Sequence, residues 1–273
     1  MKNIISLLVL FFISVATFAQ NSGEIPVPLT DPSKRAKMKV HINYGSISVK
    51  GTARKDVLVK YSGDSDDEND DNDDDDDRKN SKNGLKRIGG GNLDLEISEN
   101  SNFVKVQSDS WSTKVRLVIE VPSGMDLTLH TYNDGDIDVA NIQGEIELTN
   151  YNGEITAENI SGSVVATTYN GEIKVTFDKV TENTPMSFVT YNGDIDITFP
   201  ATLKASLKMK TQSGEVLTGF DVKLSAATPV KTEQSKGGVY TVKVDEWVRG
   251  DVGGGGAEMI MRNYNGDILV RKK

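Results

Sequence analysis

The sequence predicts an all-β protein, and more specifically a parallel β-solenoid built from coils of two short strands. Three observations predict this fold. Glycines recur every nine residues, apolar and polar residues alternate after each glycine, and two kinds of turn alternate along the chain. Together they indicate a coil of about 18 to 22 residues that repeats along the chain.

The nine-residue period is clearest in the stretch 131–175. The glycines that mark it are Gly135, Gly144, Gly153, Gly162 and Gly171. The second and fourth residues after each glycine are apolar, as in Ile137 and Val139, whereas the first and third are mostly polar, as in Asp136 and Asp138. Because side chains alternate faces along a strand, each unit predicts one short strand with an apolar inward face, followed by a turn.

Two kinds of turn alternate, which makes the true repeat two units long. One is Tyr-Asn-Gly, at 151–153 and 169–171, and the other is Asn-Ile-x-Gly, at 141–144 and 159–162. Asn-Gly is also typical of a two-residue hairpin, so an antiparallel β-sandwich is the alternative fold. Identical turns at a constant period favour the solenoid. In it the chain winds in one direction, each coil lies on the previous one, and equivalent residues form columns about 4.8 Å apart.

Residues 1–19 have the features of a secretory signal peptide. Lys2 provides a positive start, residues 4–18 are mostly apolar, and small residues before Gln20 suit cleavage. The apolar run is short for a membrane span, and no later stretch is apolar enough to act as a transmembrane anchor. We therefore expect an exported protein, located in the periplasm, at the cell surface or outside the cell. The absence of cysteine excludes disulfides, a lipoprotein anchor and a thiol nucleophile.

Residues 20–130 are predicted to form an N-terminal β region that caps the solenoid. The segment 64–82 interrupts its strands and is expected to be a disordered loop, because eleven carboxylates between Asp64 and Asp77 repel one another. Removing these eleven charges from the formal net charge of −9 leaves +2, so the acidity is local to this loop. The loop lacks the ligand spacing of an EF-hand, and we interpret it as solvated and weakly cation-collecting.

Residues 131–273 contain the solenoid repeats. The Tyr-Asn-Gly turn returns at 191–193 and 264–266, with a relative, Gln-Ser-Gly, at 212–214. Extra residues enter at the other turn, so we expect one regular edge and one variable edge. The largest insertion, 219–256, is predicted to be a hairpin that covers the end of the stack and prevents edge-to-edge aggregation.

The repeated Tyr-Asn-Gly-Asp/Glu-Ile phrase, the inserted hairpin, the glycine run 253–256 and the closing Asn-Gly-Asp-Ile resemble the bacterial putative-adhesin family. That family is a β-solenoid domain otherwise of unknown function. The resemblance covers most of the mature chain, and its motifs specify structure rather than chemistry. It implies a surface-interaction protein and supplies no catalytic residues to carry over. The acidic loop is an insertion particular to this chain.

Two columns of candidate ligand-binding side chains are predicted along the regular edge. The aromatic column holds the tyrosines of one turn position, with an interruption at Gln212: Tyr132, Tyr151, Tyr169, Tyr191 and Tyr264. Either their rings stack on sugar faces and their hydroxyls bind sugar hydroxyls, or the rings stack on one another and shield the turn backbone. The carboxylate column follows the turn glycine: Asp136, Glu154, Glu172, Asp194, Glu215 and Asp267.

The carboxylate column requires relief from its own repulsion. Like charges at the spacing of stacked strands repel by about 1 kcal/mol per pair in water. Turn N–H donors, nearby lysines and raised pKa values would leave the column as a solvated face, whereas weakly bound divalent cations would make it a cation ladder. We expect no dedicated metal site and no cofactor.

Catalysis and nucleic-acid binding have little support. The two histidines, His41 and His130, are far apart in sequence, and no nucleophile elbow, zinc-ligand spacing or phosphate-cradling loop is present. The acidic balance disfavours nucleic acid. The sequence therefore predicts a non-catalytic surface-interaction or scaffold protein that binds a glycan or cell-envelope component along the repeat face. The alternative is a polysaccharide-active glycosidase or lyase, since paired carboxylates can serve such chemistry.

Overall fold

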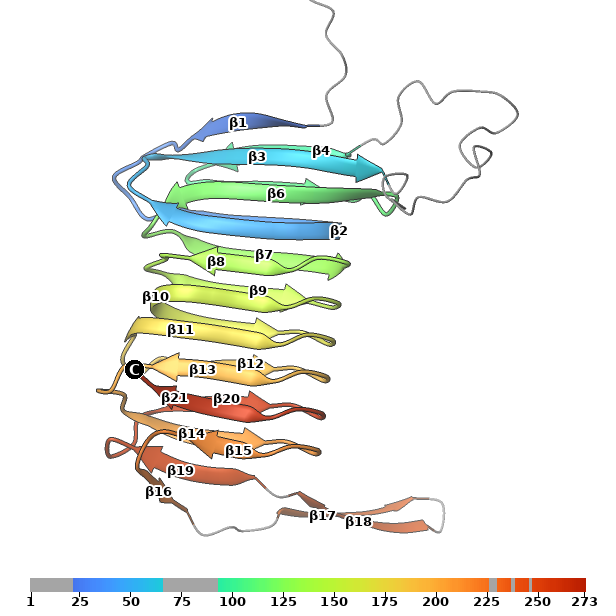
Figure 1. Cartoon of the computed structure of the whole chain (residues 1–273), viewed down its shortest axis with the longest axis vertical. Coiled ribbons are helices and arrows are strands. Elements are labelled where there is room, and N and C mark those ends of the chain that lie inside the picture. Colours follow the sequence, from blue (N-terminus) through green and yellow to red (C-terminus); the bar gives the residue numbers. More distant parts are fainter. Residues whose placement is uncertain (1–21, 66–92, 226–229, 237–238, 246) are drawn as a thin grey trace, which may run out of the picture.

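The computed structural model describes residues 22–65, 93–225, 230–236, 239–245 and 247–273. All regular secondary structure in these ranges is β-strand. Nineteen of the strands are joined by hydrogen bonds into one connected sheet network. Figure 1 shows a tall stack of short strands in two facing layers. The predicted signal peptide and most of the predicted acidic loop lie outside the described residues, while the backbone of residues 64 and 65 continues strand β3 (Asp56–Ser65).

Parallel coils make up the middle of the stack. We call the layer before each Tyr-type turn the first sheet and the layer after it the second sheet. The first sheet runs β7–β9–β10–β12 and the second runs β8–β10–β11–β13, all parallel. This confirms the β-solenoid and rules out the antiparallel sandwich. The strands are β7 (Asp126–Asn133), β8 (Ile137–Ala140), β9 (Glu145–Asn150), β10 (Ile155–Thr167), β11 (Ile173–Val180), β12 (Met186–Val189) and β13 (Ile195–Phe199).

The order of coils at the C-terminal end differs from the prediction. β20 (Ala257–Arg262) lies between β12 and β14 (Ala205–Lys210), and β21 (Ile268–Lys272) lies between β13 and β15 (Val216–Thr218). The last coil in sequence is therefore inserted between two earlier ones. The prediction that each coil lies on the previous one is wrong here, because the long insertion before β20 lets the chain pass the β14–β15 coil and return.

A similar exchange occurs near the N-terminus. β2 (Lys37–Thr52) bends from the first sheet into the second. It lies between β5 (Phe103–Ser108) and β7 in the first sheet, and between β6 (Thr113–Pro122) and β8 in the second, parallel to all four. The coil formed by β2 and the coil formed by β5 and β6 thus continue the stack. The predicted end of the N-terminal region, at residue 130, lies inside β7, and the strands on both sides of it belong to the same two sheets.

Antiparallel strands close the N-terminal end. β3 pairs with β6, β1 (Ser22–Pro28) pairs with β3, and β4 (Leu95–Asn100) pairs with β5. The outermost strand of the second sheet, β1, contains Pro26 and Pro28, which have no backbone N–H to offer. These prolines make that edge a poor template for further pairing.

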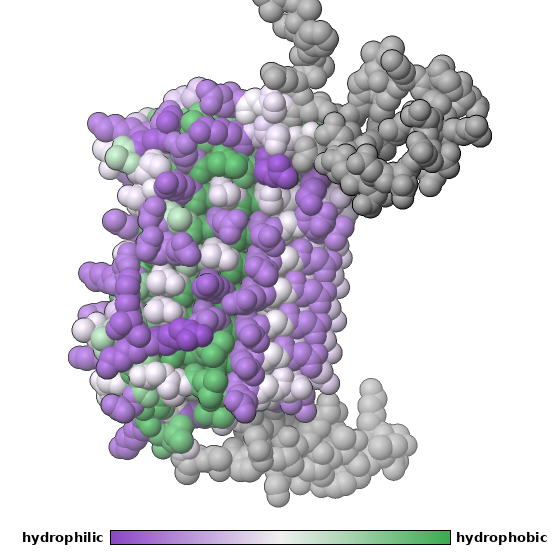
Figure 2. Space-filling view, viewed as in Figure 1, coloured by the Kyte–Doolittle hydropathy of each residue, from purple (hydrophilic) through white to green (hydrophobic). Residues whose placement is uncertain are grey.

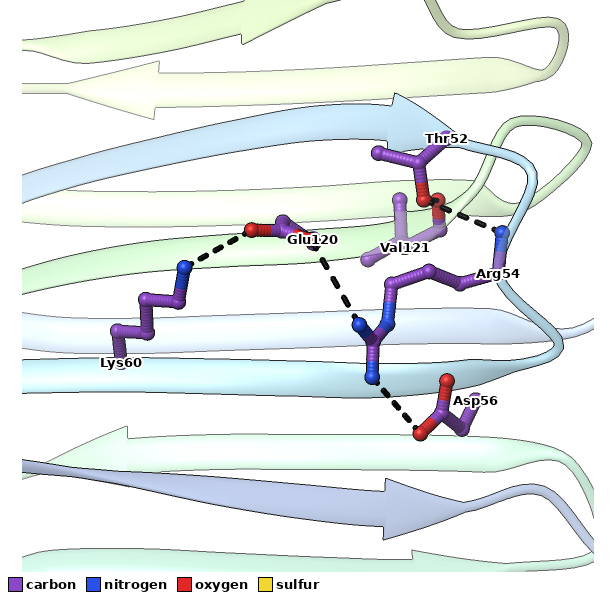
Figure 3. Close-up of polar contacts among 6 residues, drawn as sticks. All are labelled: Thr52, Arg54, Asp56, Lys60, Glu120 and Val121. Atoms are coloured by element: carbon purple, nitrogen blue, oxygen red, sulfur yellow. Dashed lines mark hydrogen bonds and ion pairs between the residues drawn. The ribbon is translucent and has the colours of Figure 1, made fainter.

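An ion-pair network fixes this cap to the solenoid (Figure 3). Glu120 on β6 accepts a 3.0 Å hydrogen bond from Lys60 Nζ on β3 and lies 3.8 Å from the Arg54 guanidinium. Arg54, in the turn between β2 and β3, also contacts Asp56 at 2.9 Å. The hydrogen bond from Lys60 holds the pKa of the Glu120 carboxyl below its usual range. The network therefore lies where parallel pairing changes to antiparallel pairing.

Two strands of the insertion 219–256 cover the C-terminal end of the first sheet. β19 (Val248–Val252) pairs antiparallel with β14, and β16 (Val222–Leu224) pairs with β19, so these two strands cover the first sheet. β17 (Val230–Lys236) and β18 (Val239–Asp245) form a separate two-stranded sheet. Within the insertion, β17 and β18 pair as a hairpin, and β16 and β19 on either side of it cover the stack because they continue the ladder of β14.

Inward side chains fill the space between the two sheets. Six coils have an isoleucine with no exposed surface at equivalent positions of the second sheet: Ile47, Ile137, Ile155, Ile173, Ile195 and Ile268. Lower in the stack, Phe177, Phe188 and Phe199 are also fully buried, and the rings of Phe177 and Phe199 stack with centroids 5.1 Å apart. Burial of this apolar surface is the main stabilising contribution, and it holds the turns of both edges in register.

Candidate functional site

The regular edge, which we call the Tyr edge, is built from one turn repeated coil after coil. On the right of Figure 1 these turns have nearly the same size, while the loops on the left vary. Each turn needs glycine. Gly153 has a φ of +147°, and a Cβ there would lie 2.2 Å from the carbonyl oxygen of Gly135 in the neighbouring coil. The backbones of successive turns therefore approach too closely for any side chain at this position.

A polar residue before each Tyr-type position, buried in five of the six coils, ties one turn to the next. Its side chain donates a hydrogen bond to the carbonyl oxygen of a turn glycine in the neighbouring coil, at 2.7 to 3.2 Å. Sequence reasoning missed these residues, although a Thr or Asn before each Tyr is visible in the sequence. They are Thr131, Asn150, Thr168, Thr190, Thr211 and Asn263.

The predicted tyrosines form one unbroken column along the Tyr edge. Neighbouring rings are parallel within 2° to 9°, and their centroids are 4.7 to 5.0 Å apart. Each residue is 40% to 46% exposed. Figure 2 shows side chains of similar hydropathy in vertical rows near this edge. In spatial order the column is Tyr132, Tyr151, Tyr169, Tyr191 and Tyr264.

The ends of the column differ from the prediction. Gln212 does not interrupt it, because the inserted last coil places Tyr264 directly against Tyr191 and leaves Gln212 beyond Tyr264. At the other end Trp111 meets Tyr132 edge-to-face, with centroids 5.4 Å apart, and is 61% exposed. Sequence reasoning missed Trp111 because its turn lacks the Tyr-Asn-Gly phrase.

The ring faces inside the column are occupied by neighbouring rings. Of the two interpretations of the aromatic column, the structure shows the rings stacked on one another. A sugar therefore has no free ring face within the column. What the tyrosines present to solvent is a series of ring edges and hydroxyl groups at nearly constant spacing.

An asparagine ladder runs beside the tyrosines. The Asn that follows each Tyr donates from Nδ2 to Oδ1 of the equivalent Asn in the neighbouring coil, at 2.7 to 3.3 Å. Such ladders of identical amides stabilise in-register parallel strands. The members are Asn133, Asn152, Asn170, Asn192 and Asn265.

Turn amides relieve part of the carboxylate column. Oδ1 of Asp136, Asp194 and Asp267 each accepts a 2.8 Å hydrogen bond from the backbone N–H of the residue below, which is Glu154, Asp267 and Glu215 respectively. This is one of the forms of relief expected from the sequence. Among the described residues, no group of three or more Asp, Glu or His side chains is arranged to hold a metal ion.

Two carboxyl groups on the outer face of the second sheet have raised pKa values. Burial raises the pKa of Glu172, and the charges of Glu154, Asp194 and Asp196 add to the effect. Burial likewise raises the pKa of Asp138, helped by Asp136, Glu154 and Glu158. This face therefore carries a concentrated negative charge on neighbouring coils.

The two histidines, distant in sequence, lie side by side in the first sheet. Because β2 pairs with β7, the rings of His41 and His130 meet with centroids 4.6 Å apart. Burial lowers the pKa of His130, and His41 and Lys39 lower it further. Neither histidine lies on the Tyr edge.

A shallow cleft of about 430 Å³ adjoins the N-terminal end of the Tyr edge. Its lining combines both charges with amides, including Lys114, Arg116, Asn133, Asp134 and Asn152. Lys114 Nζ contacts Asp134 at 2.8 Å, and this hydrogen bond lowers the pKa of the Asp134 carboxyl. The cleft therefore extends the polar character of the ladder.

Within the ranges that the structure covers, the chain forms no helix that could cross a lipid bilayer.

Comparison with known protein families identifies the family to which this β-solenoid belongs. Residues 79–252, more than half of the chain, match a family described as Toastrack DUF4097. The chain belongs to the Toastrack DUF4097 family. This confirms the resemblance drawn from the Tyr-Asn-Gly repeats, and the β-solenoid agrees with it.

One solved structure resembles this Toastrack chain over most of its length. It is described as a putative cell adhesion protein from Clostridium sporogenes, with 12% sequence identity and a TM-score of 0.46. The similarity covers 92% of the Toastrack chain and 100% of the other chain. No curated protein matches the sequence.

Proposed function

We propose that this Toastrack protein is an exported, non-catalytic interaction module. It binds an extended polar chain along the Tyr edge, and its ligand is a glycan or another cell-envelope component. The observation that carries the proposal is the in-register column of five half-exposed tyrosines, spaced 4.7 to 5.0 Å apart.

A repeating ligand suits a repeating surface. Each Tyr hydroxyl can donate one hydrogen bond and accept others, so a chain with regularly spaced polar groups meets one such hydroxyl per coil. Individually weak contacts add up when one molecule makes several at once. The stacked rings are already ordered in the free protein, so binding loses little side-chain entropy. These features favour recognition of a polymer over a small molecule.

The non-catalytic part of the proposal rests on the repetition. Asp136, Asp194 and Asp267 make the same turn hydrogen bond in three coils, as a structural column does. Export rests on the signal-like residues 1–19. Weakly bound divalent cations on the second sheet belong to the same proposal, since Glu172 lies among other carboxylates.

Paired Tyr→Phe variants provide the sharpest test. Tyr151→Phe with Tyr169→Phe keeps the stacked rings and removes two hydroxyls, whereas alanine would also disturb the stack. On a glycan array and in a cell-envelope pull-down, we expect binding to fall roughly tenfold or more, since each lost hydrogen bond is worth about 1 kcal/mol. Repeating the array with millimolar calcium shows whether cations contribute.

The control is Tyr61→Phe, which removes a hydroxyl from β3 and leaves the Tyr edge unchanged. It should bind as well as the unaltered protein. Unchanged binding by the Tyr151 and Tyr169 double variant, at equal thermal stability, would remove the tyrosine column from the proposal.

A polysaccharide-active enzyme is the competing function. The raised pKa values of Asp138 and Glu172 favour it, because a raised carboxyl pKa is the direction that suits general acid catalysis. Incubation with polysaccharides separates the two functions. Turnover that is lost in Asp138→Asn or Glu172→Gln would support the enzyme, and stable binding without turnover would support the interaction module.

A further inference from the structure

We infer that the tyrosine column is a site of oxidative cross-linking, at which neighbouring coils of one chain become joined through dityrosine. The inference is independent of the proposed ligand, since it concerns what the column does when it meets a one-electron oxidant. It rests on the distance between the rings, their exposure and the continuity of the column.

The rings are placed as translated copies of one another. With planes parallel within 9° and centroids 4.7 to 5.0 Å apart, equivalent ring carbons of neighbouring tyrosines are separated by about the same distance. A carbon–carbon bond of about 1.5 Å requires two ortho carbons to approach by roughly 3 Å. Each tyrosine is 40% to 46% exposed, which leaves the rings space on the solvent side to tilt toward each other.

The chemistry balances with a peroxide as the terminal oxidant. A one-electron oxidant of the peroxidase type takes one electron and one proton from each of two phenols, which leaves two tyrosyl radicals. The radicals couple through their ortho carbons, and the two hydrogens on those carbons return to the oxygens as the rings regain aromaticity. The peroxide takes up two electrons and two protons and becomes two molecules of water.

Coupling within one chain has a large advantage over coupling between chains. A radical on Tyr169 has a tyrosine ring in contact on each side, Tyr151 and Tyr191, so its partner is already in place. Fixed neighbours of this kind react at very high effective concentration. The chain contains no cysteine, so no thiol competes for the oxidant and no disulfide joins the coils.

The interleaved last coil lengthens the site. With Tyr264 seated against Tyr191, the five tyrosines form four adjacent pairs. Trp111 contacts Tyr132 at the exposed end and is a second point at which an electron can be removed. A radical formed anywhere along the stack can therefore reach a pair that is able to couple.

The experiment treats the dilute full-length protein with peroxidase and hydrogen peroxide. Dityrosine fluorescence is followed, and monomers are separated on a denaturing gel. A protease that cleaves after glutamate then separates the column residues, since Glu154 lies between Tyr151 and Tyr169 and Glu182 lies between Tyr169 and Tyr191. We expect monomeric protein that carries dityrosine, with linked peptides that join neighbouring members of the column.

An alternating variant isolates the column. Tyr151→Phe with Tyr191→Phe preserves the stacked rings but leaves no two tyrosines adjacent, so monomer dityrosine should fall at least tenfold. Tyr61→Phe removes a phenol from β3, away from the column, and should retain the full signal. The inference is overturned if the alternating variant keeps its signal, if links form only between molecules, or if oxidation yields hydroxylated tyrosine without links.

Discussion

Two buried asparagines illustrate how finely the residues of the turn are chosen. Asn150 and Asn263 occupy the position that is threonine in the other four coils, and each donates to a glycine carbonyl. Unlike threonine, each also carries a second polar atom. Oδ1 of both residues is buried and makes no hydrogen bond. Such an unpaired buried acceptor costs about 1 to 3 kcal/mol.

The variant Asn150→Thr should therefore be more stable than the unaltered protein. Threonine keeps a donor for the carbonyl of Gly135 and removes the unpaired oxygen. We expect the free energy of unfolding to rise by about 1 kcal/mol, measured by urea denaturation. The reverse change, Thr168→Asn, is the control and should lower it by a similar amount. A less stable Asn150→Thr variant would mean that the amide has a role beyond this hydrogen bond.

Glu172 offers a pH-dependent prediction at the same scale. Burial and nearby carboxylates raise its pKa, so the folded state disfavours its ionised form. The charge therefore destabilises the protein near neutral pH, and this penalty disappears as the pH falls through the raised pKa. Glu172→Gln should unfold at a higher temperature than the unaltered protein at pH 7.

At about pH 4 the advantage of Glu172→Gln should shrink toward zero, because the native carboxyl is then protonated. Thermal melts at the two pH values check this, with Glu147→Gln on the first sheet as the comparison. An equal gain at both pH values would show that electrostatic repulsion is not its cause.

At the scale of the element, the turn of the Tyr edge is the unit that sets the spacing of everything beside it. Its glycine allows the backbones of successive coils to meet, and the Thr or Asn before it, the stacked Tyr and the laddered Asn each bind the next coil. The turn is therefore a connector between coils as well as a reversal of the chain.

Gly153→Ala tests that view of the turn. The alanine Cβ would lie 2.2 Å from the Gly135 carbonyl oxygen, at a φ of +147° that alanine rarely adopts. We expect a loss of roughly 3 kcal/mol in the free energy of unfolding, measured by denaturant titration. Gly124→Ala is the matched control, since a Cβ there has no atom within 4 Å. Equal effects in both variants would contradict close packing at the Tyr edge.

At the scale of the whole molecule, the interleaved coils change what holds the stack together. In a simple solenoid the first and last coils have a neighbour on one side only and are the first to fray. Here β2 and the pair β20–β21 each lie between two other coils. The last two strands, β20 and β21, and the long strand β2 are thus central in the sheets, and the outermost positions of the first sheet are taken by antiparallel strands.

The sequence predicts the coil and the columns because a repeated turn demands the same residues each time. The tyrosine column follows directly from the recurrence of the Tyr-type turn. The order of the coils does not, because equivalent coils offer the same backbone edge and a similar β-branched inward residue. Nothing local distinguishes pairing of Ile195 with Ile268 from pairing with Val216. The His41–His130 contact was missed for the same reason, since only the interleaving of β2 creates it.

The most direct test of the interleaved solenoid is disulfide trapping, which has no background in a chain without cysteine. The backbones of Asn192 and Ser213 each form a parallel β-bridge with Asn265, from opposite sides of its coil. Neighbouring coils are about 4.8 Å apart, which a disulfide can span, whereas two coils are about 9.6 Å apart, which it cannot. Under mild oxidation, Asn192→Cys with Asn265→Cys should cross-link, and Asn192→Cys with Ser213→Cys should not. Cross-linking of the second pair in place of the first would show that the coils stack in sequence order and would contradict the account.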